Sequence, residues 1–188
     1  MRNIIRKYGD PILRKKCQLV EEVGSAERNL ILRMFTIMRE HEGIGLAASQ
    51  IGIERQIIVI DTGEELLDLI NPQILEERGG DSLTEGCLSL PEIFIPVKRP
   101  TRITVEGLDR YGKKVGVKAK GLLARVIQHE VDHLKGILIV DYANEKRMGK
   151  VDHLLNDLAH QSKMLIDIKN KSGRLNSTDR RDEKMGGQ

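Results

Sequence analysis

Apolar residues recur at helical spacing in three parts of the chain. In the segment 26–42 they fall three or four residues apart, at Leu30, Ile31, Met34, Phe35, Ile37 and Met38. Ser25 precedes this segment and is a candidate N-cap. The run 121–134 predicts a second helix, because the Lys135-Gly136 that follows it is typical of a helix C-terminus. A third helix is expected from about Arg147 to Ile168, with one apolar face formed by Val151, Leu154, Leu155, Leu158, Leu165 and Ile168.

The periodicity between the first two helices is that of β-strands. Aliphatic and β-branched residues dominate five short segments, at 56–60, 66–70, 74–77, 102–106 and 114–118. Turn signals separate them at Asn71-Pro72, Gly79-Gly80 and Arg110-Tyr111-Gly112, and one more short strand is expected at 137–140. This order predicts an α+β fold in which antiparallel sheets pack around the central helix 121–134, with an N-terminal and a C-terminal helix beside them.

Length and charge define the expected domain. Residues 1–168 are long enough for one domain with a sizeable core, and the polar segment 169–188 is expected to be disordered. That segment holds 6 basic and 3 acidic residues, whereas residues 1–168 hold 25 of each, so the tail accounts for the net charge of +3. Specific nucleic-acid binding by the domain is therefore not expected. Without an apolar run for a membrane span or a secretory signal, and with two cysteines, a cytoplasmic protein is expected.

The second predicted helix carries the motif His-Glu-x-x-His. His129 and His133 are four residues apart, so their side chains lie within about 40° of each other on one helix face. Two such imidazoles can bind one metal ion, and Glu130 beside them can handle the proton of an activated water molecule. The surrounding residues are apolar, which points both imidazoles inward, where an unpartnered polar group would be costly. A metal site is therefore favoured over a buried or surface histidine pair.

A catalytic metal site needs a third protein ligand and an open position. One class of proteases with this motif has a further histidine where this chain has Ile139, and Glu145 is a weak candidate. Cys87 follows Gly86 and could bind as a thiolate, and a cysteine with two histidines suits zinc or ferrous iron alike. The residues leave other readings open: Cys87 as a small packing residue, a zinc peptidase, and a metal-stapled fold with Cys17 as fourth ligand.

Three stretches together resemble the bacterial type of peptide deformylase. They are Gly43-Ile44-Gly45-Leu46-Ala47-Ala48-Ser49-Gln50, Glu85-Gly86-Cys87-Leu88-Ser89 and Gln128-His129-Glu130-Val131-Asp132-His133-Leu134, in this order. With Gly9–Arg14 and Gly121–Arg125, the resemblance covers roughly residues 3–165. It implies a metal-dependent hydrolase that removes the formyl group from the N-terminal formyl-methionine of new polypeptides and releases formate. The alternative function is a His-Glu-x-x-His zinc peptidase.

The resemblance also implies residue roles. Cys87, His129 and His133 would bind the metal, and Glu130 would accept the water proton. Gln50, through its side chain, and Leu88, through its backbone N–H, would donate to the oxygen that becomes negative. Substrate contacts would come from Ile44, Gly45, Leu83, Glu85, Leu122 and Val126.

The same resemblance implies the cofactor and the partners. The metal would be Fe²⁺, for which Zn²⁺, Ni²⁺ or Co²⁺ can substitute. The partners would be N-formyl-methionyl nascent peptides and, through the last helix or tail, the ribosome, without a membrane. For Arg99 and Asp132 the residues leave two possibilities open: an ion pair that supports the histidine helix, or a solvated surface pair.

Overall fold

The computed structural model describes residues 4–182, and from residue 169 onward the backbone alone. The helices are α1 (Ser25–Glu40), α2 (Gly121–Leu134) and α3 (Glu145–Asp182), with short 3₁₀ turns at η1 (Pro11–Arg14), η2 (Ala48–Ile51) and η3 (Ile139–Tyr142). The strands are β1 (Gly45–Ala47), β2 (Ile57–Asp61), β3 (Leu66–Arg78), β4 (Asp81–Cys87), β5 (Leu90–Arg99), β6 (Arg102–Leu108) and β7 (Lys114–Lys120). The α+β class with antiparallel sheets and three helices agrees with the prediction.

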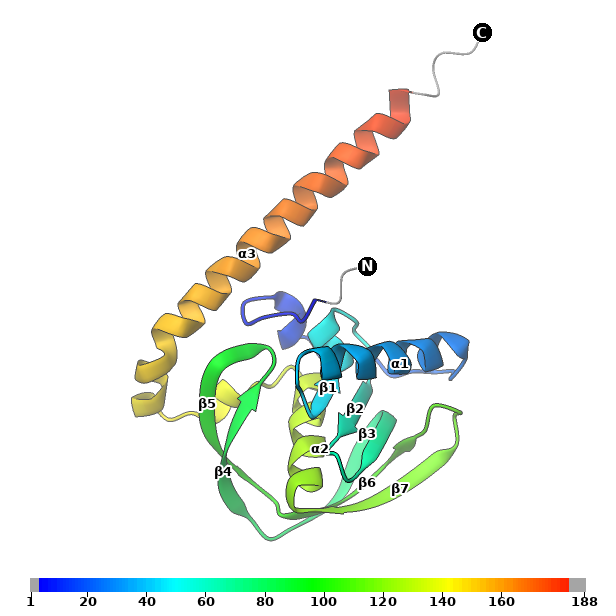
Figure 1. The fold of residues 1–188 in the computed structure, drawn as a ribbon, viewed down its shortest axis with the longest axis vertical. Coiled ribbons are helices and arrows are strands. Elements are labelled where there is room, and N and C mark those ends of the chain that lie inside the picture. Colours follow the sequence, from blue (N-terminus) through cyan, green and yellow to red (C-terminus); the bar gives the residue numbers. More distant parts are fainter. Residues whose placement is uncertain (1–3, 183–188) are drawn as a thin grey trace.

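Two antiparallel sheets flank α2. One has five strands in the order β1-β2-β3-β6-β7, and the other is the hairpin of β4 and β5. Figure 1 shows α2 between the larger sheet and this hairpin, with α1 beside β1 and β2. Among the described residues, no helix combines the length and apolar character needed to cross a bilayer.

The alternation of side chains along β2 builds two cores. Ile58 and Ile60 pack in the cluster that contains Ile127 and Val131 of α2. Ile57 and Val59 pack in a second cluster, with the apolar face of α1. Because successive side chains of a strand point to opposite faces, one buried strand joins both helices. The position of α2 over the sheet is thus set by packing on a single central strand.

Two predicted boundaries change because of contacts distant in sequence. The expected turn at Asn71-Pro72 is instead a register shift inside a continuous β3, where a proline needs no ladder partner. Asn71 has a φ of 53°, and its side-chain amide bonds both the N–H and the carbonyl of Val20 at 2.9 Å. At α1 the N-cap is Gly24, not Ser25, since the Gly24 N–H donates to Glu27 Oε2 at 2.9 Å.

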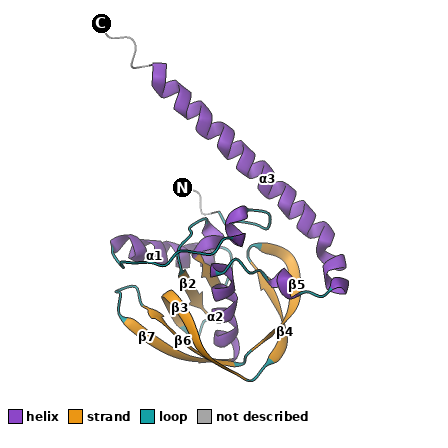
Figure 2. Cartoon of the chain, turned by 180° about the vertical axis from the view of Figure 1, so that it is seen from behind, coloured by secondary structure: helices purple, strands orange, loops and turns teal. Residues whose placement is uncertain are grey.

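Differences also occur after α2. The expected strand at 137–140 is replaced by η3, because the carboxylate of Asp141 caps the Leu138 N–H at 2.9 Å. The last helix continues to Asp182, beyond the predicted end at Ile168, and runs away from the rest of the molecule (Figure 2). Leu165 and Ile168 were expected on its buried face but are 55% and 57% exposed. The tail residues 183–188 lie outside the described residues.

Three strands lack the sequence signal that found the others. β1 has only three residues, and β4 exposes most of its side chains. β5 alternates buried and exposed residues but contains two prolines, which lower its strand propensity. The sequence therefore did not predict the hairpin of β4 and β5, which carries Cys87.

Candidate functional site

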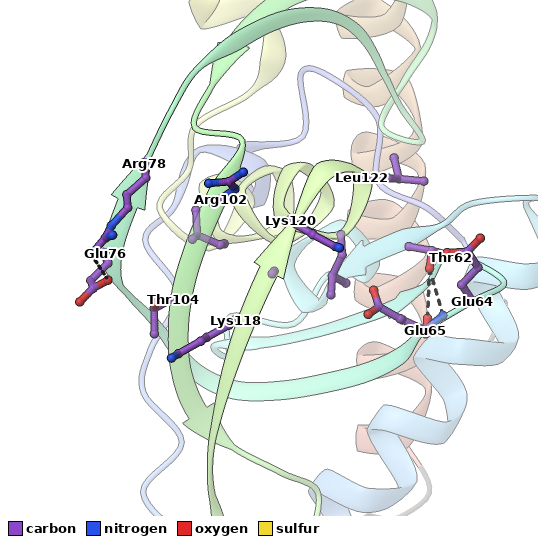
Figure 3. A pocket seen from close by; sticks show the side chains of 13 residues that line it. Thr62, Glu64, Glu65, Glu76, Arg78, Arg102, Thr104, Lys118, Lys120 and Leu122 are labelled. Carbon is purple, nitrogen blue, oxygen red and sulfur yellow. Dashed lines mark hydrogen bonds and ion pairs between the residues drawn. The ribbon is translucent and has the colours of Figure 1, made fainter.

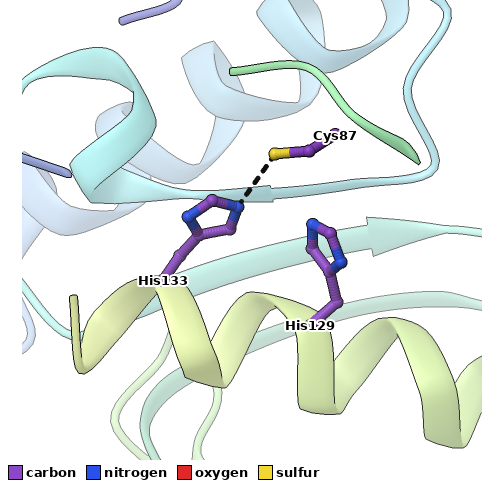
Figure 4. Close-up of side chains that lie close together, drawn as sticks. All are labelled: Cys87, His129 and His133. Atoms are coloured by element: carbon purple, nitrogen blue, oxygen red, sulfur yellow. Dashed lines mark hydrogen bonds between the residues drawn. The ribbon is translucent and has the colours of Figure 1, made fainter. Parts of the chain in front are cut away.

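Cys87, His129 and His133 converge on one point. Cys87 lies at the end of β4, and the two histidines project from successive turns of α2 (Figure 4). Their ligand atoms all lie within 4.8 Å of one another, and Cys87 Sγ is 3.2 Å from His133 Nε2. Within the described part of the chain this is the one such cluster, and neither Cys17 nor Glu145 belongs to it. Cys17 is instead buried in the core beside α2, as expected for a packing residue.

The surroundings of Cys87 favour the form of its side chain that binds metal. Burial would raise the pKa of the Cys87 thiol, but His133 and His129 outweigh it and hold that pKa well below its ordinary value. The thiolate is the form that binds metals. Zinc and ferrous iron both accept one such sulfur with two imidazoles and an open position, so the donor set fits either ion.

Glu85 orients His129 from the side away from the cluster. Its Oε2 lies 2.9 Å from His129 Nδ1, which leaves Nε2 of the ring for a metal. The same carboxylate receives two hydrogen bonds from Arg99, at 2.7 and 3.0 Å, and one from Arg125 at 2.6 Å. Burial opposes ionisation of Glu85, but His129 and Arg99 lower its pKa to about 2. Glu85 is thus fully ionised around neutral pH and fixes one imidazole.

The Arg99–Asp132 pair extends this network, and it is the supporting ion pair and not a solvated surface pair. Arg99 Nη1 is 2.7 Å from Asp132 Oδ2, and Tyr142 donates its hydroxyl to the same oxygen at 2.7 Å. Arg99 is 4% exposed, so its charge is compensated by carboxylates from both β4 and α2. The network ties the hairpin to the helix, and thereby Cys87 to the histidines.

Glu130 is the carboxylate beside the cluster. It is 3% exposed, and its Oε2 has no hydrogen-bond partner among the described residues. Burial raises the pKa of this carboxyl to about 6. Gly45 of β1 makes room for it: a Cβ on Gly45 would lie 2.7 Å from Val126 Cγ1 and closer still to Glu130 Oε1. A side chain at position 45 would therefore displace the carboxylate.

Comparison with known proteins identifies the family of this fold and cluster. The family model described as polypeptide deformylase matches residues 2–148. The chain belongs to the polypeptide deformylase family. It is 50% identical over 139 residues to the peptide deformylase of Halothermothrix orenii, a match that covers 73% of this chain and 90% of that protein.

Solved structures of peptide deformylases are similar over most of the chain. The structure from Thermus thermophilus is 36% identical with a TM-score of 0.80 and covers 84% of this chain and 98% of that one. A structure from Plasmodium falciparum is 37% identical with a TM-score of 0.81 and covers 85% and 97%.

Gln50 points its amide at the cluster of this deformylase-family chain. Its Oε1 accepts a hydrogen bond from the Ala47 N–H at 2.8 Å, so the residue also caps its own loop. Its Nε2 donates to Ser89 Oγ at 3.2 Å and to Cys87 Sγ at 3.6 Å. The N-terminal segment holds the turn between β4 and β5, because Lys7 Nζ donates to the Leu88 carbonyl at 2.6 Å. No motif or periodicity at Lys7 indicates this contact.

A cavity of about 590 Å³ opens over the site. Most residues with an expected role line it, namely Ile44, Gly45, Gln50, Glu85, Cys87, Leu88, Leu122, Val126, His129 and Glu130. His133 lies beneath them at 1% exposed. Leu83 is not among the lining residues, and its side chain is 53% exposed on β4. Phe94 and Arg125 line the cavity although the sequence analysis assigned them no role, and Phe94 lies on β5, a strand that the sequence did not predict.

Proposed function

We propose that this chain removes the formyl group from the N-terminal formyl-methionine of nascent polypeptides and releases formate. It is then a hydrolase with one divalent metal, Fe²⁺, at Cys87, His129 and His133, for which Zn²⁺, Ni²⁺ or Co²⁺ can substitute. The observation that carries the proposal is the meeting of a thiolate from β4 with two imidazoles from α2 within 4.8 Å, beside a buried carboxylate. In this proposal α2 is the central element on which both sheets assemble the site.

The bound ion would supply Lewis acidity and would bring the pKa of a water molecule toward about 7. Glu130 accepts the proton of that water, because its Oε2 is unpartnered among the described residues. A pKa of about 6 leaves Glu130 ionised at neutral pH and able to return the proton to the departing amine. Gln50 Nε2 and the Leu88 N–H serve as donors to the formyl oxygen as negative charge develops on it.

In this proposal the substrate binds in the 590 Å³ cavity and contacts the residues that line it. Gly45, without a Cβ, lets the peptide backbone approach the β1 edge, and Ile44 beside it contacts the main chain. Leu122 and Val126 are four residues apart on α2 and offer an apolar wall for the methionine side chain. Glu85 acts here through His129. A substrate contact by Leu83 stays a prediction, because its exposed side chain lies outside the cavity lining.

The test is formate release from formyl-Met-Ala-Ser by the protein loaded with Fe²⁺ under anaerobic conditions. Glu130→Ala should keep its metal and lose turnover by a factor of about 10² to 10⁴. Cys17→Ser is the matched control and should keep both metal and activity, because Cys17 is outside the cluster. Equal turnover of wild type and Glu130→Ala would remove Glu130 from the mechanism.

A zinc peptidase finds less support. Ile139 is buried in the core, and Glu145 is exposed at the start of α3, so neither gives a third ligand of the protease kind. Cleavage of an internal peptide bond, with no formate released from formyl-Met-Ala-Ser, would favour that function.

The nascent substrate leads us to propose a cytoplasmic location and the ribosome as a partner, contacted through α3 or the tail. Co-sedimentation of the full chain with ribosomes, compared with a chain that ends at Ile168, tests the second point. Equal binding by both forms would exclude the segment after residue 168 as the contact.

A further inference from the structure

A second cavity, of about 680 Å³, lies next to the candidate site. Leu122 lines both cavities, so the two are neighbours at the start of α2. Figure 3 shows residues of β3, β6 and β7 on one side of it and Thr62, Glu64 and Glu65, from the β2–β3 hairpin, on the other. Apart from Leu122, none of the residues with a proposed catalytic or substrate-binding role lines this cavity.

Three cations form a row across the strands that line it. The register pairs Arg78 of β3 with Arg102 of β6, and Arg102 with Lys120 of β7. Directly opposed residues share one face of a sheet, and like charges placed opposite each other destabilise the pairing. Arg78 contacts Glu76 at 3.4 Å. Arg102 and Lys120 have no ion-pair partner in the part of the chain that the structure describes.

Protection of a sheet edge against pairing with other chains explains only part of this row of cations. β7 is the outer strand of the five-stranded sheet, where lysines discourage pairing with other chains. Arg102, however, lies on the interior strand β6, between two other cations. A negatively charged ligand would relieve the repulsion among the three groups, and guanidinium groups bind carboxylates in particularly favourable geometry.

We propose that this second cavity is a subsite for an acidic segment of the formylated polypeptide, downstream of its methionine. The proposal rests on the proposed function, because Leu122 places the cavity beside the methionine pocket. Glu64 and Glu65 on the opposite wall, and Glu76 beside Arg78 on β3, also line the cavity and would repel the regular phosphates of a nucleic acid. A polypeptide instead brings single carboxylates, which can meet the row of Arg78, Arg102 and Lys120 and stay clear of the opposite wall.

The experiment compares formyl-Met peptides of equal length that carry acidic, neutral or basic residues after the third position. Wild-type enzyme at low salt should show the lowest KM for the acidic peptide. Arg102→Gln/Lys120→Gln should raise that KM by about three- to tenfold, and Arg102→Glu/Lys120→Glu should favour the basic peptide. Lys113→Gln/Lys114→Gln, with the same loss of charge at the far end of β7, is the matched control and should behave as wild type. The difference in KM between the acidic and the neutral peptide should disappear near 1 M salt, where charges are screened within about 3 Å.

Formyl-Met-Ala-Ser separates this proposal from the proposed function. All these variants should process it at the wild-type rate, since it is too short to reach the row. Identical KM values of wild type and Arg102→Gln/Lys120→Gln for the acidic peptide would overturn the subsite. If the protein releases no formate, fluorescence polarisation can measure binding of the labelled acidic peptide instead. Equal affinity of wild type and Arg102→Gln/Lys120→Gln would then overturn the subsite. If Arg102→Gln/Lys120→Gln lost binding to a labelled RNA but kept wild-type peptide kinetics, the peptide subsite would also be overturned. The three cations would then be assigned to nucleic-acid binding.

Discussion

Glu85 Oε2 lies 2.9 Å from His129 Nδ1, and this contact decides which nitrogen of the ring faces Cys87 and His133. The carboxylate and the imidazole come from different elements, β4 and α2, and two buried guanidinium groups hold the carboxylate in place. The site is therefore organised by an ion network behind it as well as by the three ligands.

Replacing Glu85 by glutamine should weaken metal binding by about 10- to 100-fold, because the amide no longer fixes the His129 ring. It should also lower the free energy of unfolding by about 3 kcal/mol, since Arg99 and Arg125 lose their shared buried charge. Competition for Zn²⁺ with a chromophoric chelator and urea unfolding measure the two effects. Glu106→Gln, exposed on β6, is the control. Unchanged metal affinity in Glu85→Gln would contradict the orienting role.

Glu130→Gln should stabilise the metal-free protein at neutral pH. Burial raises the folded-state pKa of Glu130 from 4.5 to about 6. Below 4.5 the carboxyl is protonated in both states, whereas above 6 the folded protein must hold a buried carboxylate, so stability falls as the pH rises through 6.

The gain from Glu130→Gln should be about 1–2 kcal/mol near pH 7.5 and should shrink toward pH 4.5. Urea unfolding of the two chelator-treated proteins at about pH 5 and about pH 7.5 provides the measurement. A difference that does not depend on pH would show that ionisation of Glu130 is not its origin.

Lys7→Met should reduce kcat about tenfold with little change in KM, because the loop that carries Leu88 loses its 2.6 Å anchor. Lys7→Arg, which keeps a cation at this position, should recover part of the rate. Steady-state kinetics on formyl-Met-Ala-Ser and metal content should be measured together. Lys16→Met, at an exposed neighbouring position, controls for the charge. A pure rise in KM would place Lys7 in substrate binding instead of loop positioning.

Removing residues 169–188 should change neither the thermal midpoint nor turnover of formyl-Met-Ala-Ser. The buried residues of α3 among those described are Val151, Leu155, Leu158 and Ser162, and the following Leu165 and Ile168 are more than half exposed. Leu155→Ala on the same helix should instead cost about 2–5 kcal/mol, because it opens a cavity in the core. Calorimetry of the wild type, the truncated chain and Leu155→Ala tests whether the domain ends at residue 168. A lower thermal midpoint of the truncated chain would show that the domain extends beyond this residue.

Local pattern was sufficient to find the three helices, although not every helix end, and several strands. The spacing of His129 and His133 placed both on one face of α2, and Lys135-Gly136 marked its end, since helix periodicity and capping are short-range. The fold class and the family resemblance also came from the sequence. The turn expected at Asn71-Pro72 was wrong because Val20, far away in sequence, satisfies the Asn71 side chain and keeps β3 continuous.

The sequence by itself determined which residue types could bind a metal, and that the two histidines share a helix face. Only the tertiary structure decided that Cys87 meets them, that Glu85 serves His129, that Lys7 holds the Leu88 loop and that Leu83 lies outside the cavity. The physical reason is that helix and strand periods depend on neighbouring residues, whereas these contacts depend on how a hairpin, a helix and an N-terminal segment pack against one another.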